Sequence, residues 1–177
     1  MNWIWWDTYN FTDADRDGKY FNETIGFTSG SNWVTDVTDS IIEITDGQVS
    51  SGNDIDYWCI SYKSVPGFSK INNFKGNGSS DGPFFYTGFR PAWVMIKRID
   101  VAENWWLLDN TRNTYNPVIN YLSSNTNNQE YSNLSNVVDF TSNGVKVRTT
   151  TTAINANGST YVYMAFAEQP FKFSNAR

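Results

Sequence analysis

The apolar runs of this sequence are short. Each run is a few residues long, often alternates with polar residues, and ends at Gly, Pro, Asn, Asp or Ser; this is typical of antiparallel strands joined by turns. Leucine occurs four times, whereas Asn, Ser and Thr together make 56 of the 177 residues, so long helices are disfavoured. The pattern predicts an all-β fold, an antiparallel β-sandwich with jelly-roll-like units. The expected elements are strands at residues 3–6, 41–45, 55–62, 68–74, 83–86, 93–98, 105–108, 137–140, 145–150 and 159–168, and a short helical turn within residues 110–121.

The composition excludes several kinds of chemistry. The sequence has no histidine and a single cysteine, Cys59, which rules out Ser-His-Asp and Cys-His catalysis, most zinc sites and an intramolecular disulfide. A net charge of −5 without a cluster of Lys and Arg argues against nucleic acid as a partner. No apolar run approaches the roughly 20 residues that span a bilayer, and the N-terminus lacks the basic flank and apolar core of a signal peptide. We therefore expect no membrane insertion and no export signal.

Four short segments recur in the same order along the chain. Residues 2–7 (NWIWWD) align with 104–109 (NWWLLD), 36–38 with 139–141, 42–44 with 145–147, and 57–62 (YWCISY) with 161–166 (YVYMAF). Ordered matches at a nearly constant offset indicate an internal duplication. We predict an incomplete copy at residues 1–66 and a complete copy at residues 67–177.

The incomplete first copy has two interpretations. Either residue 1 is a boundary inside a longer protein, or the shortened copy borrows strands from another chain or covers its bare sheet edge against one. An unpaired sheet edge invites association. The second interpretation therefore predicts a homo-oligomer or a lattice of copies.

Part of the sequence resembles a known family. The residues that carry the resemblance are 67–70 (GFSK), 76–98 (GNGSSDGPFFYTGFRPAWVMIKR), 161–168 (YVYMAFAE) and 170–172 (PFK). They are similar to the β-rich domain of unknown function that recurs, often in tandem, in tail-fibre-like and other structural proteins of marine tailed phages. The first 66 residues share this resemblance only through the repeat.

The resemblance implies a virion component that is made in the host bacterial cytoplasm and assembled onto a particle, without disulfides. It brings no active site to transfer to this chain. It leaves open whether the protein belongs to a tail fibre, a head fibre or the capsid surface. The short form of the chain, without a long attachment region before the repeat, favours the capsid surface.

Three acidic residues near the N-terminus have the spacing of a cation-binding loop. Asp13, Asp15 and Asp17 alternate with other residues and are followed by a glycine, so their side chains can converge on one hard cation, for which calcium is the natural occupant. In a twelve-residue calcium loop the last acid would fall at Thr24, and Glu23 is one position short. A calcium site and a solvated acidic loop therefore both stay open.

Aromatic residues make 17% of the chain, and their faces can stack on sugars or on partner proteins. Most lie in strand patterns, and the tryptophans predicted to be core residues on that ground are Trp5, Trp58, Trp93 and Trp105. Trp33, Tyr115 and Tyr131 lie in polar loops instead. We predict that these three are exposed and contact either another subunit or a glycan.

The carboxylates form no recognisable acid/base motif, and the separation in space that defines a glycosidase pair is not readable from sequence. We therefore predict no enzyme activity. The predicted function is that of a virion structural protein, which decorates or stabilises a phage particle by contacts with other virion proteins. The alternative is a tail-fibre adhesin that binds host surface glycans.

Overall fold

The computed structural model of this chain describes residues 60–132 and 138–170, together with Thr24 and the backbone of four short strands nearer the N-terminus. The short strands form two antiparallel pairs, β1 (Ile4–Trp5) with β2 (Lys19–Tyr20), and β3 (Val34–Val37) with β4 (Ile42–Ile44). The two longer described ranges contain all the other elements.

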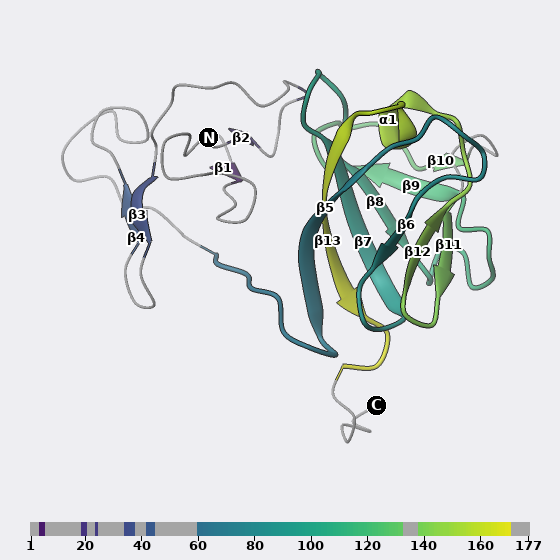
Figure 1. The fold of residues 1–177 in the computed structure, drawn as a ribbon, viewed down its shortest axis with the longest axis horizontal. Helices are drawn as coiled ribbons and strands as arrows, with labels where there is room; N and C mark the ends of the chain where they lie inside the picture. The colour runs from purple at the N-terminus through teal and green to yellow at the C-terminus, as the bar shows by residue number, and fades with distance from the viewer. Residues whose placement is uncertain are drawn as a thin grey trace.

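Two antiparallel sheets of unequal width face each other and form a β-sandwich (Figure 1). The six-stranded sheet has the order β10-β9-β8-β7-β13-β5. Its strands are β5 (Ser69–Lys75), β7 (Pro91–Arg98), β8 (Trp106–Asp109), β9 (Asn120–Ser123), β10 (Tyr131–Ser132) and β13 (Thr160–Ala167). The three-stranded sheet has the order β11-β12-β6, with strands β6 (Phe84–Tyr86), β11 (Val138–Thr141) and β12 (Gly144–Val147). The prediction of an all-β, antiparallel sandwich is confirmed.

Alternation along the central strand β13 gives the six-stranded sheet two different apolar faces. Tyr161 and Tyr163 point toward the three-stranded sheet, are at most 2% exposed, and join the larger core cluster. Val162 and Met164 point the other way and belong to a second buried cluster with Met95 of β7. Because the period of two places one set of side chains on each face, a strand that is apolar throughout predicts burial on both sides.

The outer face of the six-stranded sheet also contains a buried lysine. Lys97 of β7 is 1% exposed, and its ammonium lies 6.0 Å from the ring of Trp105. It donates to the carbonyl oxygens of Thr24 (2.9 Å) and Glu103 (2.5 Å), and the Glu103 N–H donates to the same Thr24 oxygen (2.7 Å). Thr24, from the early part of the chain, is therefore bonded to two residues of this face.

The two hairpins that the predicted duplication aligns share the register of two residue pairs, and β3–β4 then shifts between Val34 and Asp36. In β3–β4, Asp36 lies opposite Glu43 and Val37 opposite Ile42. In β11–β12, the aligned residues also face each other, with Asp139 opposite Lys146 and Phe140 opposite Val145. The duplication itself stays a prediction, and so does the boundary between residues 66 and 67.

Several expected elements differ from those observed. Residues 60–62, expected to end a strand, are not in one, and no helix forms at residues 110–121, where residues 110–112 form a turn and 114–117 a bend. The described helix is instead α1 (Thr152–Asn155). Strands β9 and β10 were not predicted, because each is short and rich in polar residues. Within the part of the chain that the structure describes, no helix has the length and apolar character to cross a membrane.

Candidate functional site

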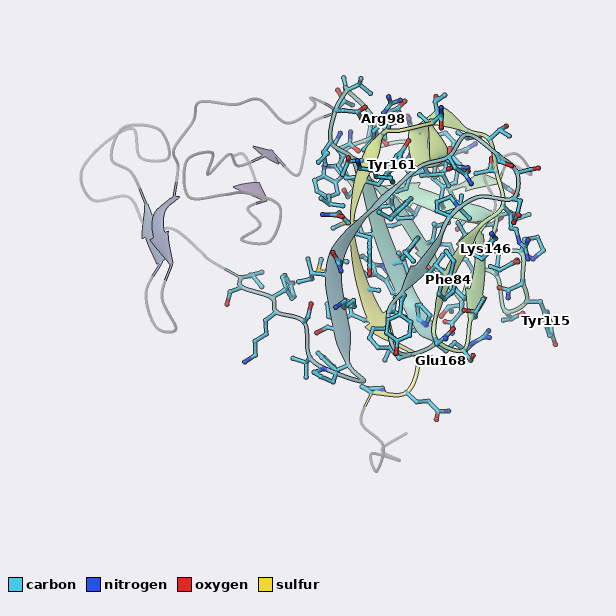
Figure 2. The ribbon with its side chains drawn as sticks, viewed as in Figure 1. Phe84, Arg98, Tyr115, Lys146, Tyr161 and Glu168 are labelled. Atoms are coloured by element: carbon cyan, nitrogen blue, oxygen red, sulfur yellow. The ribbon has the colours of Figure 1, made fainter. Side chains whose placement is uncertain are left out.

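Strand β6 carries two exposed aromatic side chains on the outer surface of the three-stranded sheet. Between them Phe85 points inward, where its ring centroid lies 4.6 Å from that of Phe74 and 4.4 Å from that of Tyr163. Since successive side chains of a strand point to opposite faces, Phe84 and Tyr86 point outward and are 46% and 61% exposed. The packing of Phe85 thus fixes the direction of both neighbours; Figure 2 labels Phe84 on this side of the sandwich.

Gly144 of β12 leaves room for these rings. A Cβ at this position would come within 2.5 Å of the Phe84 ring and 2.4 Å of the Phe85 carbonyl oxygen. Contacts below 3.0 Å require something to shift, and here one of the atoms is backbone. The glycine therefore allows β12 to pair closely with β6 while Phe84 stays on the outer face.

The charged residues around the two rings are paired with one another. Lys146 lies 2.7 Å from Asp81, and Arg148 lies 2.7 Å from Asp139. The hydrogen bond from Lys146, together with its charge, lowers the pKa of Asp81 below its ordinary value. The surface thus combines exposed rings with charges that are already neutralised. We call it the aromatic face; it comprises Asp81, Phe84, Tyr86, Asp139, Lys146 and Arg148.

A buried asparagine holds the loop that leads into β6. Asn155 is fully buried at the end of α1. Its side-chain oxygen accepts from the Asn77 N–H (2.9 Å), and its amide nitrogen donates to the carbonyls of Ser79 (2.8 Å) and Thr149 (2.6 Å). Both ends of the amide are therefore used. The loop before the aromatic face is fixed by contacts to a residue far along the sequence.

The edge strand β5 of the six-stranded sheet is closed by its own chain. The Ser64 hydroxyl accepts from the Ile71 N–H (3.0 Å) and donates to the Ile71 carbonyl (3.2 Å). Val65 and Ser69 exchange two main-chain hydrogen bonds of 3.0 Å. The Asn73 N–H donates to the side-chain oxygen of the preceding residue (2.8 Å). These bonds occupy main-chain groups that would otherwise offer a template for another strand.

The edge strand β11 of the three-stranded sheet is closed in a similar way. The side-chain amide of Asn116 imitates a strand, because its oxygen accepts from the Phe140 N–H and its nitrogen donates to the Phe140 carbonyl, both at 2.9 Å. Next to it, Val118 and Val138 exchange main-chain bonds of 2.8 and 3.2 Å. The outward main-chain groups of this edge are therefore hydrogen-bonded at Val138 and at Phe140.

The edge of β6 is different. Just beyond the strand, the Thr87 N–H donates to the Asn143 carbonyl (3.0 Å), which sets the alternation and turns the main-chain groups of Phe84 and Tyr86 away from β12. The Tyr86 carbonyl accepts from the hydroxyl of Tyr163 (3.0 Å). Among the described residues, nothing pairs with the N–H groups of Phe84 and Tyr86 or with the Phe84 carbonyl. We call these two main-chain positions the open edge.

The residues predicted as contacts lie elsewhere. Tyr115 is 85% exposed in the turn before β9, apart from Phe84 in Figure 2. Tyr131 lies in strand β10 and not in a loop, and its half-buried ring stacks on that of Tyr121 at 4.8 Å. Burial in turn raises the pKa of Tyr121. The remaining predicted site residues lie outside the described residues: Asp13, Asp15, Asp17 and Trp33.

Most described carboxylates lie against a basic side chain. The pairs not yet mentioned are Arg90–Glu168, Arg98–Asp100, Arg112–Asp109 and Arg112–Glu130. In the described ranges, no group of three acidic, histidine or cysteine residues is placed to hold a metal ion. The calcium prediction concerns residues 13–17 and stays a prediction.

These features define a β-sandwich domain with a fixed, charge-paired aromatic face beside an open strand edge. The chain belongs to the family described as a domain of unknown function, DUF7483, which matches residues 2–170. The match runs through both predicted copies. No curated protein and no solved structure matches the chain.

Proposed function

We propose that this protein is a structural component of a tailed-phage virion, which decorates or stabilises the particle by protein–protein contacts through the aromatic face. The observation that carries the proposal is the pair of exposed rings, Phe84 and Tyr86, on one short and firmly held strand. Exposed aromatic side chains supply apolar contact area at low cost in conformational entropy, and they are enriched at protein interfaces.

The charges of the aromatic face suit such a contact. Burying a lone charge costs several kcal/mol, whereas Asp81 and Asp139 already have partners at 2.7 Å. A partner can therefore cover the rings while the ion pairs stay at the rim. This arrangement resembles the apolar centre and polar rim of known interfaces.

The setting on a virion rests on the resemblance to phage structural proteins at residues 67–70, 76–98, 161–168 and 170–172. The aromatic face lies within this region, because strand β6 and the preceding loop belong to residues 76–98. The single cysteine, which excludes an intramolecular disulfide, agrees with assembly of the protein in a bacterial cytoplasm. The absence of histidine agrees with a protein that acts through surface contacts.

The alternative function is binding of host surface glycans by a tail-fibre adhesin. Tyr115, at 85% exposure, favours it, because an isolated and accessible ring can stack on a sugar. The two functions use different residues. A glycan array probed with the purified chain and with a Tyr115→Ala variant separates them, since the adhesin function predicts hits that this substitution abolishes.

The proposal is tested on particles purified from cells infected by a phage that encodes this chain. Quantitative mass spectrometry should find the chain at a constant ratio to the major capsid or tail proteins. A Tyr86→Lys variant should be depleted from the particles, whereas Val101→Lys, a control at an exposed apolar residue of the β7–β8 loop, should be incorporated as the wild type is. Particles without the chain, from cells that express it, would contradict the proposal.

A further inference from the structure

The open edge has the geometry of a self-complementary strand. The outward main-chain groups belong to Phe84 and Tyr86, which lie at equal distances on either side of Phe85. If Phe85 lies on a two-fold axis, Phe84 of one chain faces Tyr86 of the other in antiparallel pairing. Each such pair exchanges two N–H···O hydrogen bonds. All outward groups at these two positions then have partners.

We propose that β6 pairs with β6 of a second copy of this chain and joins two three-stranded sheets into one continuous sheet across the dimer. This inference rests on the proposed function, because it names a second copy of the chain as the protein that the aromatic face contacts. The order of the joined sheet is β11-β12-β6 followed by the same strands of the second copy in reverse, and the six-stranded sheet of each chain remains behind it.

The side chains of β6 support this partner. Phe84 and Tyr86 share the outer face, so in the antiparallel pair each ring lies opposite the other kind of ring in the second copy. Cross-strand aromatic pairs stabilise antiparallel strands. Four rings thus gather on one surface and cover each other. A second copy of this chain therefore supplies both the Phe and the Tyr that each cross-strand pair needs.

The hydrogen bond that the Tyr86 carbonyl already accepts does not prevent the pairing. The Tyr86 carbonyl accepts from Tyr163 inside the sandwich, and a carbonyl oxygen has a second lone pair for the incoming N–H. The net charge of −5 opposes self-association in general. Beside β6, however, Asp81 is neutralised by Lys146 at 2.7 Å, so repulsion at the contact itself is weak.

Of the other edges of the two sheets, those of β5 and β11 are closed by their own chain. The β5 edge is occupied by Ser64 and Val65, and the β11 edge by Asn116 and Val118. A two-fold contact uses the same strand of both copies and closes on itself. The product is therefore a dimer and not a filament. Because β6 has three residues, the contact is small, and we expect weak association that depends on concentration.

Light scattering after size exclusion tests the inference on the full chain over micromolar to sub-millimolar concentrations. The weight-average mass should rise from 20.2 kDa toward twice that value. Tyr86→Lys should keep the monomer mass at every concentration, because it removes the ring opposite Phe84 of the second copy and places two lysines on either side of the two-fold axis. Val101→Lys adds the same charge at an exposed apolar residue in the loop between β7 and β8 of the other sheet, and it should dimerise as the wild type does.

A wild type that stays at 20.2 kDa at the highest concentration overturns the inference, and so does equal loss of dimer in the Tyr86→Lys and Val101→Lys variants. Thermal melting shows whether Tyr86→Lys is folded. If it is not, amide exchange of the wild type at low and high concentration decides, since protection at Phe84 and Tyr86 must increase with dimerisation. A monomeric chain that is still found in particles refutes the pairing and leaves the proposed function standing.

Discussion

Strands β5 and β6 lie on the same side of the sandwich, one from each sheet, and their inward rings Phe74 and Phe85 stack at 4.6 Å. The main-chain groups at their outward edges differ in hydrogen bonding. Along β5, the Ser64 hydroxyl bonds both main-chain groups of Ile71. Along β6, the corresponding groups of Phe84 have no partner among the described residues.

The difference separates an edge that is protected from one that is available. Proteins avoid uncontrolled association by filling or covering their sheet edges. In this chain Ser64 occupies the edge of β5 and Asn116 that of β11. Strand β6 instead combines main-chain groups that have no partner among the described residues with the exposed rings of Phe84 and Tyr86. An edge left open beside apolar side chains is where a specific contact is expected.

The largest effect is expected from Gly144→Val, which tests whether β6 pairs with β12 as described. Any Cβ at this position meets the Phe85 carbonyl oxygen at 2.4 Å, so a valine must displace β6. Overpacking of this kind destabilises by about 3 kcal/mol. Urea unfolding measures the change, and Ser142→Ala, in the exposed turn of the same hairpin, should change stability by less than about 0.5 kcal/mol. Wild-type stability in Gly144→Val would mean that the position of β6, and hence its open edge, is wrong.

The second prediction concerns the closed edge of β11. Asn116→Ala removes both of its hydrogen bonds to the main chain of Phe140. The Phe140 carbonyl still accepts from Arg90 (3.3 Å), but the buried N–H is left unsatisfied, so the variant should be destabilised by about 2 kcal/mol. The control is Thr114→Ala, an exposed change in the same turn, with an effect below about 0.5 kcal/mol. If the two variants unfold at the same urea concentration, Asn116 does not close this edge.

A smaller effect is expected from Ser64→Ala, which makes β5 resemble β6. The lost bonds to Ile71 are exposed, so the cost in stability is about 0.5–1 kcal/mol. The newly open edge should add species larger than a dimer in light scattering, because each chain then has two sites for strand pairing. Ser64→Thr keeps a hydroxyl and should behave as the wild type. Unchanged masses in Ser64→Ala would show that the serine does not govern association.

The smallest effect is expected from the ion pair at the rim of the aromatic face. Lys146 lowers the folded-state pKa of Asp81 below its ordinary value of 3.8, so the pair adds stability above that pH and loses it as the pH falls through the folded-state pKa. Asp81 is 82% exposed, so the contribution is small and screened by salt. Urea midpoints of wild type and Asp81→Asn should differ slightly at neutral pH and converge in acid. A difference that grows on acidification would contradict the assignment.

The sequence predicted the strands whose side chains alternate or are apolar throughout. Strands β5, β6, β7 and β13 lie within a residue or two of the expected ranges, because burial on one or both faces determines their composition. The polar segment of β9 gave no such signal: Asn120 and Ser123 stand at its ends, and the strand forms because β8 pairs with it. Tertiary pairing overrides a weak local preference.

The candidate site was harder to predict for two physical reasons. A run of three aromatic residues in β6 indicates a buried strand, and only the three-dimensional position of Phe85 shows that its neighbours point outward. The edge-closing side chains act over distance: Asn116 bonds a residue 24 positions away, and Asn155 bonds one 78 positions away. Tyr115 was predicted as an exposed residue and is exposed, whereas Tyr131 is held by stacking on Tyr121.

The pairing of β6 with a second copy is tested most directly by amide hydrogen exchange at the edges of β5 and β6 in the wild-type chain. In dilute solution the Ile71 N–H, bonded to Ser64, should exchange slowly, and the N–H groups of Phe84 and Tyr86 should exchange fast. As concentration rises into the range of dimerisation, protection should appear at Phe84 and Tyr86 and stay constant at Ile71. Fast exchange at Phe84 and Tyr86 at every concentration would contradict the pairing of β6 with a second copy.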